Sequence, residues 1–90
     1  MAKGQYPDDP VFSDTLGWMY YKKSVYIKAV SLLRESAEKL SRNPEVRYHL
    51  GMAYAKNGEK GLAKQELTES LKLGRGFPGA EEAKRILKAL

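Results

Sequence analysis

The stretch Leu16-Gly17-Trp18-Met19-Tyr20 returns further along the chain as Leu50-Gly51-Met52-Ala53-Tyr54. The same shift in position relates other sets of identical residues: Pro10/Pro44/Pro78, Ala29/Ala63, Leu33/Leu67 and Ser36/Ser70. A fixed period of about 20 to 50 residues is typical of stacked supersecondary units, none of which can bury its apolar face alone. We therefore expect a short array of repeated units that offers surfaces for binding.

Helix start and stop signals divide the 90 residues into five predicted helices, at about 10–23, 25–40, 44–56, 59–73 and 80–90. Pro10 and Pro44 suit the first turn of a helix, where a missing N–H costs nothing. Asp8 or Asp9 can cap the first of these helices and Asn43 the third. No alternating β-branched run predicts a strand. The predicted fold class is all-α, with two antiparallel helix–turn–helix units and a C-terminal capping helix.

The two predicted hairpins differ at their turns. Asn57-Gly58 supplies a residue that enters the left-handed conformation without strain, whereas Ser24 stands at the position equivalent to Gly58. We therefore expect a less favourable first turn. The predicted organisation is a flexible leader at 1–9 and one domain at 10–90, which divides into a first repeat at 10–43, a second at 44–77 and the capping helix at 78–90.

The motif residues resemble the tetratricopeptide repeat (TPR) family, whose helix–turn–helix unit of about 34 residues has the pattern Trp-x2-Leu-Gly-x2-Tyr, Ala-x3-Phe and Pro. The two copies here read Ser13-x2-Leu16-Gly17-x2-Tyr20, Ala29-x3-Leu33, Pro44 and Arg47-x2-Leu50-Gly51-x2-Tyr54, Ala63-x3-Leu67, Pro78. Both copies lack the opening Trp. The strings Asp14-Thr15-Leu16-Gly17-Trp18 and Arg47-Tyr48-His49-Leu50 are similar to the C-terminal end of long bacterial arrays. The resemblance implies an α-solenoid with a right-handed superhelix.

Packing roles follow for the motif residues. Gly17 and Gly51 should let paired helices approach closely, with Ala29 and Ala63 as the small residues opposite them. Other apolar positions predict where further helices pack. Phe12 and Met19 lie where an upstream repeat would cover them, so we expect the chain to be the tail of a longer array. Tyr26 and Ile27 should belong to the core between the repeats, the inter-repeat core. The last helix should bury its apolar stripe and turn its charged residues to solvent: the buried set is Ala80, Ala83, Ile86, Leu87 and Leu90, and the solvent-facing set is Glu81, Lys84, Arg85 and Lys88.

A helical wheel predicts the functional surface. On the first and third helices, one face points away from the Leu-Gly-Tyr core positions, and in a stacked array these faces join into a concave groove. In the resembling family, such a groove usually holds a peptide. An aromatic and methionine-rich strip with lysines at its edge suits a peptide or helix with apolar anchors and some acidic charge. The predicted groove residues are Asp14, Trp18, Tyr21, Lys22, Tyr48, Met52 and Lys56. The alternative is that these aromatic residues pack on the leader or on the last helix.

Nothing in the sequence predicts catalysis, so we expect no enzyme, no cofactor and no metal. The absence of cysteine excludes disulfides and thiol chemistry. His49 is the only histidine and has no carboxylates at metal-ligand spacing, which favours a packed or solvent-edge role. No stretch predicts a signal or membrane-spanning segment, which leaves the cytoplasm and the bacterial cell envelope open as compartments.

The expected partner is another protein, and two alternatives stay open. The first is self-association, as a homo-oligomer, through the exposed first helix. The second is weak nucleic-acid binding, because the net charge is +5. The lysines are dispersed among glutamates along the whole chain, which is typical of solvated helix faces and argues against a phosphate-binding stripe. We therefore expect neither a nucleic acid nor a membrane as partner.

Overall fold

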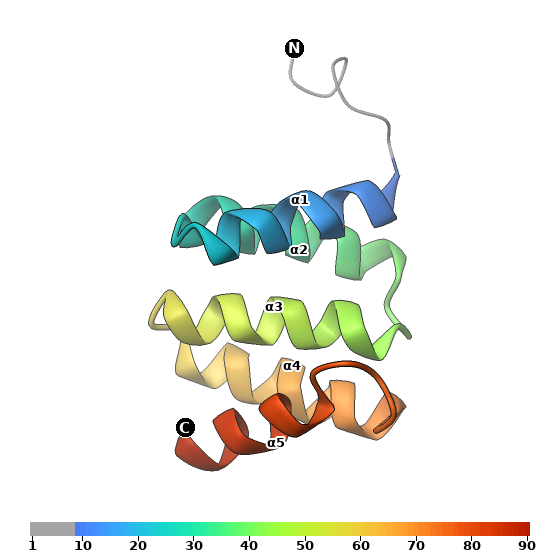
Figure 1. Cartoon of the computed structure of the whole chain (residues 1–90), viewed down its shortest axis with the longest axis vertical. Coiled ribbons are helices and arrows are strands. Elements are labelled where there is room, and N and C mark those ends of the chain that lie inside the picture. Colours follow the sequence, from blue (N-terminus) through green and yellow to red (C-terminus); the bar gives the residue numbers. More distant parts are fainter. Residues whose placement is uncertain (1–8) are drawn as a thin grey trace.

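The computed structural model describes residues 9–90, which form five α-helices joined by short turns (Figure 1). The helices are α1 (Pro10–Lys22), α2 (Tyr26–Lys39), α3 (Pro44–Lys56), α4 (Lys60–Leu73) and α5 (Ala80–Ala89). A single constant shift, the one that relates Pro10 to Pro44, carries every boundary of α1 and α2 onto the equivalent boundary of α3 and α4.

The described residues contain no strand. The predicted all-α class is confirmed, and each predicted helix end coincides with the observed end or is its immediate neighbour in sequence. The predicted leader falls, except for Asp9, outside the described residues. Local start and stop signals therefore located the helices correctly.

The first helix of each pair starts at a side-chain cap followed by proline. The Asp9 carboxylate accepts a hydrogen bond from the backbone N–H of Val11 at 2.9 Å. The Asn43 side-chain oxygen accepts bonds from the N–H groups of Glu45 and Val46 at 3.0 and 3.1 Å. These N–H groups have no partner within a helix, so the caps satisfy donors that would otherwise rely on water. Both predicted caps are confirmed.

The turns inside the two hairpins use the same backbone conformation with different residues. Ser24 has a φ of 65° and Gly58 has a φ of 85°. Among the described residues, Ser24 is the only one other than glycine with a positive φ. A side chain in this conformation meets the following carbonyl group, which costs about 1 to 2 kcal/mol. The expected difference between the two turns is therefore confirmed.

Each hairpin closes around its motif glycine. A Cβ atom on Gly17 would lie 2.8 Å from Cγ of Leu33, and one on Gly51 would lie 2.8 Å from Cγ of Leu67. Real Cβ contacts are not this short, so the helices of each pair approach as closely as they do because these positions lack a side chain. The predicted close approach is confirmed. The residues nearest to Gly17 and Gly51 are Leu33 and Leu67, however, and not the expected Ala29 and Ala63, because each leucine lies one turn further along its helix.

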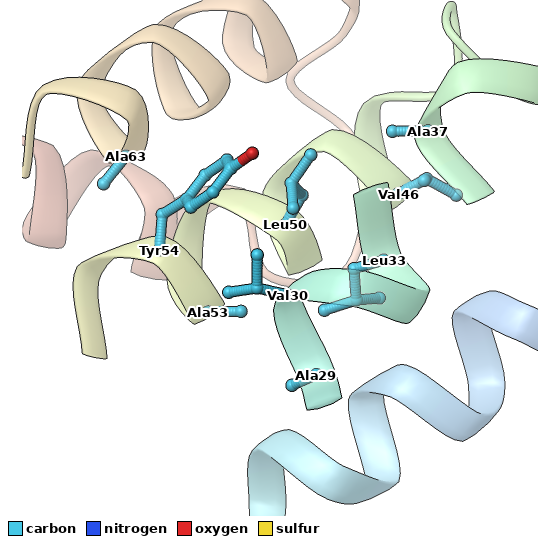
Figure 2. Close-up of a cluster of buried hydrophobic side chains, with 9 residues drawn as sticks. All are labelled: Ala29, Val30, Leu33, Ala37, Val46, Leu50, Ala53, Tyr54 and Ala63. Atoms are coloured by element: carbon cyan, nitrogen blue, oxygen red, sulfur yellow. The ribbon is translucent and has the colours of Figure 1, made fainter. Parts of the chain in front are cut away.

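A continuous apolar core joins the two hairpins (Figure 2). It contains small and branched residues of α2, the core face of α3 and one alanine of α4: Ala29, Val30, Leu33, Ala37, Val46, Leu50, Ala53, Tyr54 and Ala63. Ile27 is not part of this core, and its side chain is 76 % exposed. The expectation that Ile27 is inter-repeat core is wrong, because α3 packs on the face of α2 that carries Ala29, Val30, Leu33 and Ala37.

The last helix, α5, packs against α4 and α3 at the end of the stack opposite α1 (Figure 1). Ala80 and Ala83 are buried there, and Ile86, Leu87 and Leu90 are partly buried, as the predicted apolar stripe requires. The charged residues of α5 form pairs along the helix, Lys84 with Glu81 at 3.3 Å and Arg85 with Glu82 at 2.6 Å. Pairs at this spacing support a helix only slightly, because exposed charges are screened by water.

Candidate functional site

The face of α1 that is turned toward α3, which we call its inner face, carries two stacked aromatic rings. The ring centroids of Trp18 and Tyr21 are 4.4 Å apart, and the two ring planes are almost parallel at 3°. Both side chains are partly exposed. Residues three apart on a helix point in nearly the same direction, which lets one ring lie on the other. The pair therefore forms a partly exposed apolar surface on this helix.

Trp18 also packs on α3. Its ring centroid lies 4.1 Å from that of His49 and 5.6 Å from that of Tyr48. We call Trp18, Tyr21, Tyr48 and His49 the aromatic cluster. Each contact between the two helices joins residues of different repeats, so the cluster exists only because α1 and α3 lie side by side. Aromatic pairs at these separations contribute about 0.5 to 1.5 kcal/mol beyond their buried area.

A side-chain hydrogen bond also joins the same two helices. Nδ1 of His49 lies 2.8 Å from Oδ1 of Asp14, and both side chains are mostly buried. This contact fixes the imidazole ring against Trp18 and explains how a polar ring can be buried without an unsatisfied atom. The prediction that His49 has a packing role is confirmed. Asp14, expected to line the groove, instead uses one carboxylate oxygen to position His49.

Tyr48 and Met52 are not available on the surface. The expectation that they lie on a partly exposed strip is wrong: Tyr48 is 7 % exposed and Met52 is 4 % exposed. Both belong to a core with Leu67, Leu71 and the first residues of α5. The physical reason is the path of the chain after α4, which brings α5 over this part of α3 and buries the apolar strip there.

The segment before α5 passes close to the ring of Tyr48. A Cβ atom on Gly79 would lie 2.5 Å from Cε2 of Tyr48, and the φ of Gly79 is 101°. The ring of Phe77 lies 5.7 Å from that of Tyr48. Sequence reasoning missed Phe77 and Gly79 as parts of this region. The glycine-rich break between α4 and α5 was the available signal, since it predicts a sharp change of direction but not where the chain then goes.

Burial changes the acidity of two phenols in the aromatic cluster. Burial raises the pKa of Tyr21, and electrostatic interactions with Tyr26 and Glu82 add to this effect. Burial also raises the pKa of Tyr48, with Glu82 again contributing. Both phenols therefore stay neutral over the physiological pH range. Glu82 of α5 contributes to both shifts, a second feature that the sequence did not predict.

The two predicted lysines lie at equivalent helix ends. Lys22 is the last residue of α1 and Lys56 is the last residue of α3, and both are exposed. Cations in a last turn interact favourably with the helix dipole. Of the predicted groove residues, Trp18 and Tyr21 therefore come together as a partly exposed apolar surface, and both lysines are exposed. Asp14 is turned toward His49. Tyr48 and Met52 are buried.

Two further structural findings concern residues 9–90. None of the helices there is long and apolar enough to cross a membrane. No group of three or more metal-ligating side chains comes together within this part of the chain. Compared with known proteins, the chain matches no family model, no curated protein and no solved structure.

Proposed function

We propose that this chain is a protein–protein interaction module of the TPR type, a right-handed α-solenoid scaffold in which two repeats are closed by a capping helix. Three observations support the proposal. The boundaries of the two helix pairs differ by one constant shift. Each pair closes on a motif glycine. The two pairs pack through the faces that the repeat pattern assigns to the core.

The observation that carries the binding site is the Trp18–Tyr21 pair. These two rings are stacked, apolar and partly exposed, whereas α5 covers the equivalent strip on α3. Tryptophan and tyrosine are enriched among residues that dominate binding energy, because they bury a large area with few rotatable bonds. We place the peptide-binding surface on the inner face of α1, beside the part of α3 that α5 covers, with Lys22 and Lys56 at its edge.

The chemistry of this surface defines the partner. A short extended or helical segment with one or two apolar anchors can lie on the stacked rings, and an acidic side chain can then meet one of the two exposed lysines. The burial of Tyr48 and Met52 shortens the surface relative to a full groove. We therefore expect a ligand of few residues rather than a long helix.

Peptide selection tests this proposal. Random peptides displayed on phage are selected on the whole chain, and binders are counter-selected on the Trp18→Ala/Tyr21→Ala variant. We expect peptides that combine apolar anchors with Asp or Glu. Titration of a selected synthetic peptide should change the fluorescence of Trp18, the only tryptophan. Each single alanine variant should weaken binding by more than about 1 kcal/mol, roughly fivefold.

Leu62→Ala is the matched control, because Leu62 is an exposed apolar residue on α4, away from the aromatic cluster. It should leave peptide binding unchanged, and circular dichroism of every variant checks that the helices persist. Peptides that bind the Trp18→Ala and Tyr21→Ala variants as tightly as they bind the unmodified chain would overturn the proposed site.

A further inference from the structure

An open hollow lies between the end of α4 and α5, at the end of the helix stack opposite α1 (Figure 1). We call it the α4–α5 cleft, and its volume is about 790 Å³. Leu71 and Leu87 are its apolar leucines. Four cations and one carboxylate also line it: Arg75, Lys84, Arg85, Lys88 and Glu81. The cleft is therefore partly apolar and strongly cationic.

The repeat relates this cleft to a smaller one between the two hairpins. The smaller cleft has a volume of about 210 Å³ and is bordered by Glu66 of α4. The constant shift between the repeats carries four of its residues onto residues of the α4–α5 cleft: Ala37, Ser41, Leu50 and Tyr54 become Leu71, Arg75, Lys84 and Lys88. Among residues 9–90, no helix stands to α5 as α4 stands to α3. The α4–α5 cleft is therefore the same site without the helix that borders it.

The residues that receive a helix on α3 are replaced by cations on α5. The motif residues of α3 are all buried: Leu50, Gly51 and Tyr54. Their equivalents on α5 are Lys84, Arg85 and Lys88. An apolar helix such as α4, which offers Leu67 to the motif glycine, does not suit this surface, because burying a cation without an opposite charge is costly. A helix that carries carboxylates at these contacts does suit it.

The ion pairs of the two clefts point to the same ligand charge. In the smaller cleft, Glu66 of α4 meets Arg47 of α3 at 2.8 Å, so the helix that borders the site already presents a carboxylate to a cation. The equivalent of Arg47 is Glu81, which is paired with Lys84 at 3.3 Å. Within residues 9–90, Arg75 and Lys88 take part in no ion pair. These two exposed cations are therefore available to the carboxylates of a ligand.

We propose that the α4–α5 cleft binds an acidic helical segment of a partner protein, placed against α5 as α4 is placed against α3. Asp or Glu side chains of the segment meet Arg75, Lys84 and Lys88, and an apolar side chain packs on the two leucines of the cleft. Because Arg85 replaces the motif glycine, the segment lies farther from α5 than α4 lies from α3. No residue of the aromatic cluster lines the cleft, so this site is separate from the peptide-binding surface on α1.

A library of helical peptides displayed on phage tests the cleft. Peptides are selected on the whole chain and counter-selected on the Lys84→Glu/Lys88→Glu variant. We expect peptides rich in Asp and Glu, with apolar residues three or four positions apart. A selected peptide, synthesised with a fluorescent label, is then titrated with each variant. Reversing the two charges should raise its dissociation constant at least about tenfold, because like charges then face each other. The Trp18→Ala/Tyr21→Ala variant should bind this peptide as the unmodified chain does.

Lys23→Glu/Lys28→Glu is the matched control, because it makes the same change of charge at two exposed lysines near the opposite end of the stack. It should change the affinity less than about twofold, since distant exposed charges are screened by salt. A peptide with Lys in place of each acidic residue should bind the Lys84→Glu/Lys88→Glu variant, which also shows that this variant is folded. Equal losses in the two charge variants, a library without such peptides, or equally tight binding of a labelled oligothymidine would overturn the proposal.

Discussion

Replacing Gly51 by alanine tests whether the motif glycine sets the distance between α3 and α4. The added Cβ would lie 2.8 Å from both Cγ and Cδ2 of Leu67 and 3.2 Å from its backbone nitrogen. Leu67 is fully buried, so its side chain cannot turn out to solvent. Gly51 also lies in the middle of α3, where alanine would otherwise favour the helix.

Two opposing effects decide the result. The change from glycine to alanine in a helix interior stabilises a protein by about 0.8 to 1 kcal/mol. Forcing an extra methyl group into a packed interior destabilises it by about 1 to 3 kcal/mol. We therefore expect the free energy of unfolding to fall by up to about 2 kcal/mol for Gly51→Ala, and we expect Gly51→Leu to leave the domain unfolded or several kcal/mol less stable.

Urea unfolding followed by circular dichroism measures these free energies. Gly61→Ala is the control, because a Cβ at Gly61 would have no atom within 4 Å, and this change should be neutral or slightly stabilising. A double-mutant cycle with Leu67→Ala isolates the clash, since that change removes the two side-chain atoms that the new methyl group meets. If Gly51→Ala proves as stabilising as an unhindered mid-helix alanine, the close approach does not depend on glycine and the reasoning fails.

The remaining predictions concern the hairpin turns and high pH. Ser24→Gly should stabilise the chain by about 0.5 to 1 kcal/mol and Gly58→Ala should destabilise it by about 1 kcal/mol, because both positions have a positive φ; thermal melts that rank the two changes the other way would contradict this. Burial raises the pKa of Tyr21, Tyr48 and Tyr54, so above pH 10.0 the unfolded chain releases protons that the folded chain keeps. The free energy of unfolding should therefore be insensitive to these groups below that pH and should fall above it. Urea melts at a series of alkaline pH values measure this fall. If the phenols were freely exposed, these melts would show no such fall.

Local chemistry in the sequence was sufficient to predict the helices and their pairing. Pro10 and Pro44 with the caps before them determine where α1 and α3 begin, because a cap and a first-turn proline act within a few residues. The repeat period determines that the two pairs are alike, and it identifies Gly17 and Gly51 as the points of close approach. These features depend on neighbours in sequence or on repetition, and both can be read from one chain.

The tertiary structure alone decided what covers each face. Tyr48 and Met52 have the same helical position as residues of an open groove, but the chain reverses after Gly79 and α5 buries them. Asp14 meets His49, which belongs to the other repeat, only because α1 and α3 lie side by side. Ile27 is exposed although its apolar character suits a core. In each case the outcome depends on which helix arrives from elsewhere in the chain, and the free energy of burying an apolar side chain is the same whichever neighbour supplies the contact.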